Sequence, residues 1–313
     1  LVLRDRGAVP APRRLNAPHR RLDLRRPVGA LVGRYRDGHM LALDPEFRRK
    51  YAPNDLLVVM SDTGDEHPET YRHVKVMKGF FHDHDIDFIH VTPAMGFHSP
   101  SWQTLRGFYN LKSTVGSKCF RKTCTMRLKL QPIYSFLEQY IAVHYGVSCG
   151  RKAGFVEFSR EFGKVRMIVG IAKGEEKRVA DPNKEPQRWK RLSVETVYPL
   201  IELGMDRKAC QEYMRSVGLP VPPPSNCILC PFTSEAELLW LHRFMPRDFE
   251  DWVRIERNKL EKFKHLGSKN YGVFGALTLP EVLERAKHKH GHMTDEELQR
   301  YKFSHGHCVQ SAY

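Results

Sequence analysis

The sequence predicts an α/β fold in which a mostly parallel sheet is followed by a helical C-terminal extension. From Asp55 onward, short apolar runs alternate with amphipathic segments, which is the pattern of parallel strands joined by helical crossovers. With 313 residues, 41% of them hydrophobic, the chain is long enough for one large α/β domain with an appendage or for two small domains. After Ser234 the periodicity is helical up to about His265.

Apolar periodicity, Pro and Gly place the individual elements. One helix starts with Pro132 and stops near Gly146, and a later helix stops at Gly218. In chain order we expect a strand at 56–60, a helix at 68–84, a strand at 87–92, a helix at 132–145, a strand at 165–171, a helix at 205–217 and a helical region at 234–265. Residues 266–313 are polar and His-rich, and we expect them to be peripheral.

The charge is strongly positive and unevenly distributed. The net charge is +15, and residues 1–40 hold ten Arg, no Lys and three Asp. We expect residues 1–39 to be a disordered or atypical segment, either a basic arm or a stretch outside the natural reading frame. The positive excess in the rest of the chain indicates a solvated basic surface or an anionic partner, which would be a nucleotide or a nucleic acid.

Composition also bears on location and on metal binding. The chain has no run of about 18 apolar residues and no apolar segment of a secretory signal, so we expect no membrane partner. Seven Cys, an odd number, favour reduced thiols or metal ligands over disulfides, and hence a cytoplasmic protein. Cys227 and Cys230 have the spacing that lets two sulfurs converge on one metal or cluster, and Pro231 follows them directly.

Three further motifs accompany this Cys pair. They are the Asp62-Thr63-Gly64 turn after a strand, the run from Cys124 to Pro132, and the loop from Gly170 to Arg178. In this order the four motifs resemble the phosphoadenosine phosphosulfate (PAPS) reductase family of the adenine nucleotide alpha hydrolase-like (PP-loop ATPase) superfamily. The resemblance implies a doubly wound sheet. It divides the chain into residues 1–39, a nucleotide-binding domain at 40–233, and a helical extension with a His-rich tail at 234–313.

The resemblance also implies a site. The nucleotide-binding residues would be Asp62, Thr63, Gly64, Glu66, Arg127, Lys129, Gly170, Glu175 and Arg178. The metal ligands would be Cys124, Cys210, Cys227 and Cys230, holding a 4Fe-4S cluster, with zinc as the alternative. Each part has a plainer explanation: an ordinary βα turn at 62–64, an exposed charged turn at 174–178, and a core position for Cys210.

The chain departs from the family in three places. Residues 29–38 do not match the Gly-rich pyrophosphate loop, which indicates lost activity or a reading-frame artefact. Ala172 replaces a residue that is often basic in relatives. Cys308 lies in His-Gly-His-Cys-Val rather than in the Glu-Cys-Gly motif of the nucleophile, so no catalytic residue is assigned and a sulfonucleotide reductase is disfavoured.

The expected function is therefore an enzyme that binds ATP or PAPS, with Mg²⁺, and acts in sulfur chemistry. It would be an oxidoreductase that reduces an adenylyl sulfate, or a transferase that moves sulfur to a nucleic acid or a small molecule at the expense of ATP. The expected partners are the adenine nucleotide, DNA or RNA, and a sulfur-donor protein. The alternative is a non-catalytic nucleic-acid-binding or degenerate relative that has lost the pyrophosphate loop.

Overall fold

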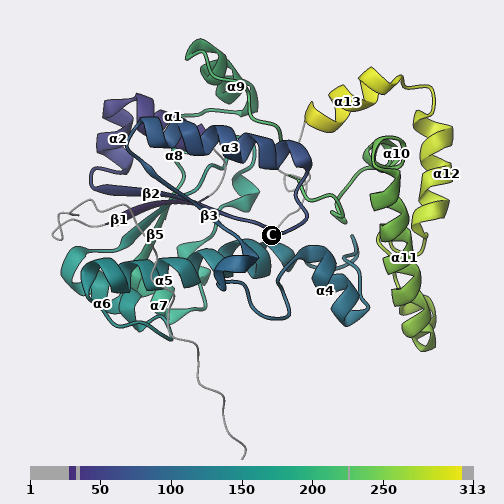
Figure 1. Cartoon of the computed structure of the whole chain (residues 1–313), viewed down its shortest axis with the longest axis horizontal. Helices are drawn as coiled ribbons and strands as arrows, with labels where there is room; N and C mark the ends of the chain where they lie inside the picture. The colour runs from purple at the N-terminus through teal and green to yellow at the C-terminus, as the bar shows by residue number, and fades with distance from the viewer. Residues whose placement is uncertain (1–27, 33–35, 225, 305–313) are drawn as a thin grey trace, which may run out of the picture.

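A computed structural model describes residues 28–32, 36–224 and 226–304 of the chain (Figure 1). Helices and strands are both present, which confirms the α/β class. In these ranges, no helix is both long enough and apolar enough to pass through a lipid bilayer.

Five parallel strands form one sheet in the order β3-β2-β1-β4-β5. β1 lies at the centre, where Ala30 pairs with Leu57 of β2 and with Met167 of β4. Because the strands are parallel, their carboxyl ends share one edge, and open α/β sheets bind ligands at that edge. The strands are β1 (Val28–Val32), β2 (Asp55–Ser61), β3 (Asp87–Val91), β4 (Val165–Ile168) and β5 (Val194–Val197).

The central strand corrects one prediction. Residues 28–32 were expected to belong to a disordered or atypical segment, yet they form β1 and pair with a strand on each side. The Arg-rich composition of residues 1–40 concealed a short apolar run, Val-Gly-Ala-Leu-Val, that parallel pairing stabilises on both edges. A helix begins at Arg36, soon after this strand. Residues 1–27 and 33–35 lie outside the described part of the chain.

Helices cover both faces of the sheet (Figure 1). Successive side chains of β2 point to opposite faces, so Leu57 and Val59 join one core and Val58 joins the other. The core with Val58 is covered by α1 (Arg36–Leu43), α2 (Pro45–Tyr51), α3 (Pro68–Asp83), α8 (Pro199–Glu202) and α9 (Arg207–Ser216). The other core is covered by α5 (Gln131–Tyr145), α6 (Ala153–Phe162) and α7 (Arg188–Ser193).

Between β3 and α5 the chain passes the carboxyl edge of the sheet and forms α4 (Leu105–Lys112) and the π-helical turn η2 (Thr125–Leu130). Ser61 Oγ, at the end of β2, donates a 2.6 Å hydrogen bond to the carbonyl of Leu128 and so fixes η2 beside the sheet edge. Shorter 3₁₀ turns are η1 (Pro93–Met95), η3 (Glu176–Arg178), η4 (Pro182–Lys184) and η5 (Lys264–Lys269).

The C-terminal extension packs around a third core. It contains α10 (Glu235–Phe244), α11 (Pro246–Lys262), α12 (Leu279–His290) and α13 (Asp295–Ser304). Trp252 is fully buried at its centre. The helical region expected at 234–265 is divided at Met245, because Pro246 has no amide hydrogen with which to continue the helix.

Residues 266–304 are not peripheral as expected, because α12 and α13 bury five apolar side chains in this third core. These side chains are Leu279, Val282, Leu283, Ala286 and Leu298. His-rich composition obscured the apolar face of α12, where the His and Lys residues gather in the last, exposed turn. Residues 305–313 lie outside the described residues.

Candidate functional site

The loop after β2 is a closed turn. Asp62 Oδ1 accepts hydrogen bonds from the Gly64 amide and from the Tyr71 hydroxyl, both at 2.8 Å. Gly64 has φ +70°, and an added Cβ would lie 2.3 Å from Thr104 Cγ2. Asp62, Thr63 and Gly64 were predicted to bind the nucleotide. In the structure they form an ordinary turn between β2 and α3, which was the alternative explanation. The Asp62 and Thr63 side chains are buried.

This turn carries the Cys pair. Glu66 and Cys227 form an antiparallel bridge, flanked by hydrogen bonds from the His67 amide to the Asn226 carbonyl at 3.1 Å and from the Ile228 amide to the Asp65 carbonyl at 2.7 Å. The Cys227 sulfur lies 3.3 Å from Thr63 Oγ1 and 3.7 Å from Glu66 Oε1. Two of the four motifs are therefore joined through their backbones.

Lys129 completes this cluster from η2. Its Nζ lies 2.9 Å from Glu66 Oε1, so a cation and a carboxylate are paired next to the Cys227 thiol. Burial raises the pKa of that thiol well above its usual range, and the Glu66 charge raises it further, while the Lys129 charge opposes them. Arg127, two residues before Lys129, is exposed, and its Nη1 lies 3.4 Å from Gln131 Oε1.

Three of the four Cys expected to bind metal lie together. Cys124, Cys227 and Cys230 all lie within electrostatic range of the buried Tyr109 hydroxyl. Cys210 does not join them, because it is buried on α9 in the core between the helices and the sheet, as its plainer explanation proposed. In the part of the chain that the structure describes, no group of three or more His, Cys, Asp or Glu residues is arranged to hold a metal ion. The structure thus separates Cys210 from the other three Cys of the predicted set, and the cluster or zinc ion stays a prediction.

Two lysines that sequence reasoning did not select approach the Cys pair. Lys118 Nζ donates to the Thr233 carbonyl at 2.7 Å, and the Thr233 amide donates to the Cys230 carbonyl at 3.1 Å. Lys302 of α13 lies 3.5 Å from Glu237 and is buried. Burial lowers the pKa of Lys302, whereas Glu237 and Cys230 act in the opposite direction. No sequence pattern could have identified Lys302 as a site residue, because its position near Cys230 depends on how the C-terminal extension packs.

The loop after β4 holds a second cluster at the same edge of the sheet. Glu175 is buried and accepts hydrogen bonds from Arg178 Nη1 at 2.5 Å and from Arg207 Nη2 at 2.6 Å. The Lys173 amide bonds to the Met205 carbonyl at 2.8 Å, which places the loop against the start of α9. Gly170 is buried below the loop. Glu175 and Arg178 are therefore paired with each other, and Arg207 is a third member that the sequence motif did not include.

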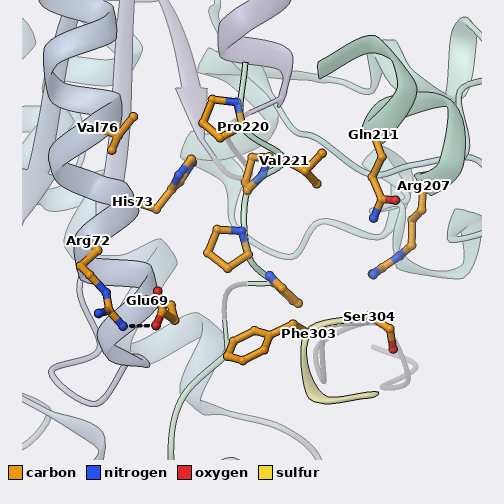
Figure 2. A pocket seen from close by; sticks show the side chains of 13 residues that line it. Glu69, Arg72, His73, Val76, Arg207, Gln211, Pro220, Val221, Phe303 and Ser304 are labelled. Carbon is orange, nitrogen blue, oxygen red and sulfur yellow. Dashed lines mark hydrogen bonds and ion pairs between the residues drawn. The ribbon is translucent and has the colours of Figure 1, made fainter. Parts of the chain in front are cut away.

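A cavity of about 520 Å³ lies between α3 and α9 (Figure 2). Figure 2 shows the side chains of α3 on one wall and Arg207 and Gln211 of α9 on the other, with the Pro-rich segment between them. The cavity is lined by Glu69, Arg72, His73, Val76, Arg207, Gln211, Pro220, Val221, Pro222, Pro223, Pro224, Phe303 and Ser304. Its walls thus combine two guanidinium groups with apolar surface. Arg207 connects it to Glu175, and Pro224 leads toward the Cys pair.

A salt-bridge network fixes the extension to the β2 loop. Arg106 Nε lies 3.0 Å from Asp65, and its terminal nitrogens contact Asp248 at 2.6 Å and Asp251 at 3.0 Å. Burial raises the pKa of Asp65, and the Arg106 charge opposes that rise. The Cys pair is therefore held between the sheet unit and α11.

Comparison with family models, with curated proteins and with solved structures gave no match for this chain.

Proposed function

We propose that the chain binds an adenine nucleotide at the carboxyl edge of a doubly wound sheet and uses it for ATP-dependent sulfur transfer. This is the chemistry of a transferase in the PAPS reductase-like branch of the PP-loop ATPase superfamily. The strand order, with β1 at the centre and helices on both faces, supports the doubly wound type. The observation that carries the proposal is the bridge between Glu66 and Cys227, which brings a thiol to the edge where nucleotides bind.

The cavity between α3 and α9 is the nucleotide site in this proposal. Its volume of about 520 Å³ lies within the range of small-molecule sites. Arg72 and Arg207 would neutralise phosphate charge through bidentate hydrogen bonds. The Pro-rich wall and Val76 would cover the apolar faces of the base and ribose. The side chains of Asp62 and Thr63 are committed to their own turn, so the β2 loop would position Cys227 rather than hold phosphate.

In the proposed reaction, an oxygen of the acceptor attacks the α-phosphorus of ATP and pyrophosphate leaves. A sulfur nucleophile then displaces AMP from the activated acceptor. We place this course ahead of reduction of an adenylyl sulfate, because reduction needs a thiolate that attacks sulfur directly and Cys308 lacks the Glu-Cys-Gly motif of that nucleophile. Cys308 lies outside the described residues.

Nucleotide titration calorimetry tests the site. We expect Arg207→Ala and Arg72→Ala to weaken ATP binding by about tenfold or more, the loss of one charge-assisted hydrogen bond. Arg160→Ala, which removes an exposed Arg on α6, is the matched control and should change the affinity less than about twofold. Because Arg207 also pairs with buried Glu175, Arg72→Ala serves as the variant that leaves the fold intact.

Two outcomes would contradict the proposal. One is a failure of the unmodified chain to bind ATP or to release pyrophosphate with any acceptor, which would leave the non-catalytic alternative. The other is an equal response of Arg72→Ala and Arg160→Ala, which would remove the cavity as the site.

A further inference from the structure

A long segment of the chain carries only positive charge. Between Asp87 and Glu138 there is no Asp or Glu, while the same segment contains seven Lys and Arg. Its middle part, residues 117–122, crosses the surface of the extension. Here Arg121 is exposed and Lys118 is anchored by its backbone amide, which donates to the Val273 carbonyl at 2.9 Å.

The facing segment is basic as well. From Arg257 to Pro280 the chain has one acidic residue, Glu261. Lys264 and Lys269 are exposed there, in and at the end of η5. Lys259, which is buried, donates to the Tyr271 carbonyl at 2.7 Å and so holds this segment beside α11. The bond from the Lys118 amide to the Val273 carbonyl places these two basic segments side by side.

Aromatic rings lie within these two segments. Phe120 is 57% exposed, and its ring lies 5.9 Å from that of Tyr271 in an edge-to-face arrangement. Lys118 Nζ lies 3.8 Å above the Phe274 ring. An exposed aromatic ring such as that of Phe120 adds little to the stability of the fold. Placed among cations, it suits a partner that has both flat apolar faces and negative charge. We define the basic–aromatic strip as Lys118, Phe120, Arg121, Lys122, Lys264, Lys269 and Tyr271.

The basic–aromatic strip is continuous with the candidate site. Lys122 Nζ lies 5.3 Å above the ring of Phe232, which is two residues beyond Cys230. Lys118 Nζ bonds to the Thr233 carbonyl in the same turn. A chain-like ligand bound along the strip would therefore be led toward Cys230 and Cys124.

We infer that the basic–aromatic strip binds a single-stranded nucleic acid, with a base stacked on Phe120 and phosphates paired with Arg121, Lys264 and Lys269. Bases stack on exposed rings irrespective of sequence, and Lys and Arg side chains pair with the phosphates of the backbone. A duplex hides its base faces and would leave Phe120 without a partner. Only the idea that this nucleic acid accepts the sulfur rests on the proposed function. Binding of the single strand to the basic–aromatic strip needs no nucleotide.

Fluorescence anisotropy with a labelled 15-nucleotide single strand, as DNA and as RNA, tests the inference without ATP. We expect Phe120→Ala to weaken binding by about fivefold or more and Phe120→Trp to retain it, as base stacking is worth about 1–3 kcal/mol. The triple variant Arg121→Glu, Lys264→Glu, Lys269→Glu should lose about 100-fold in affinity and flatten the salt dependence. The control triple Arg160→Glu, Lys75→Glu, Lys78→Glu changes the same charges on exposed positions of α6 and α3 and should lose less than about tenfold.

Three results would overturn the inference: no binding of either strand, equal losses in the two triple variants, or tighter binding of a duplex with no effect of Phe120→Ala. The Arg72→Ala variant separates this inference from the proposed function. If it loses ATP but keeps the single strand, the two sites are independent. If the unmodified chain binds the strand but never binds ATP, the proposed function fails and the inference stands.

Discussion

The loops after β2 and β4 leave the same edge of one sheet, yet they have opposite characters. The β2 loop is closed: its carboxylate and hydroxyl side chains are buried and bonded to their own turn and to Cys227. The β4 loop lies against the start of α9, where Arg207 reaches from buried Glu175 to the wall of a cavity. In our proposal the β2 loop therefore positions the Cys227 thiol, while the β4 loop presents Arg207 to the nucleotide. The predictions below test this difference.

The largest effect is expected at Gly64, where the β2 loop is most crowded. Gly64→Ala should lower the free energy of unfolding by about 3 kcal/mol, because the new Cβ meets Thr104 and a positive φ is strained for Ala. Urea denaturation measures this loss. Thr104→Ser removes the Cγ2 methyl but keeps the hydroxyl that caps α4. In the double variant it should restore part of the stability. A loss below about 1 kcal/mol in the single variant would show that the loop is not closed.

A smaller effect is expected from pH at the cavity. Burial lowers the pKa of His73 to about 4, below its ordinary value of 6.5. The unfolded chain then binds more protons than the folded chain between these pH values, so this contribution is fully present above pH 6.5 and is lost as the pH falls toward 4. We expect about 2 kcal/mol of stability to be lost across this window. Urea denaturation at pH 7, 5.5 and 4.5 measures the loss, and His73→Gln should reduce the slope.

The smallest effect on stability is expected at Arg72. Its ion pair with Glu69 is exposed on α3, and such pairs contribute little. Arg72→Ala should change the free energy of unfolding by less than about 0.5 kcal/mol even though it weakens ATP binding. A loss similar to that of Gly64→Ala would show that Arg72 supports the fold instead of facing a ligand.

The hydrophobic pattern of the sequence was sufficient to predict the longer helices and the most apolar strands. The strands at 55–61 and 87–91 and the helices at 68–83, 131–145 and 207–216 lie within two residues of their expected bounds. The strand expected at 165–171 ends at Ile168, where the backbone enters the Glu175 loop. β5, α4, α6 and α7 were not predicted, because they are short or interrupted and depend on packing against the sheet.

The site was predictable in its parts but not in its assembly. Spacing alone selected Cys227 and Cys230, and the structure brings Cys227 to Glu66, which in turn pairs with Lys129. Cys210 was grouped with them, although its helix faces a different core. Arg207 and Lys302 were missed because their roles come from contacts between elements that are distant in the sequence. Neither the hydrophobic periodicity nor a short motif in the sequence indicates contacts between such distant elements.

The central position of β1 has a consequence for how this chain is made. Among the five strands that the structure describes, β1 is synthesised first, and Met167 of β4 is synthesised long after its partner Ala30. Until then β1, β2 and β3 can pair with one another, but the edge of β1 that faces β4 stays open. Contacts of such sequence separation slow folding and lengthen the exposure of strand edges. An expression product that begins at residue 40 would lack the strand between the two halves of the sheet and would present two unpaired edges to aggregation.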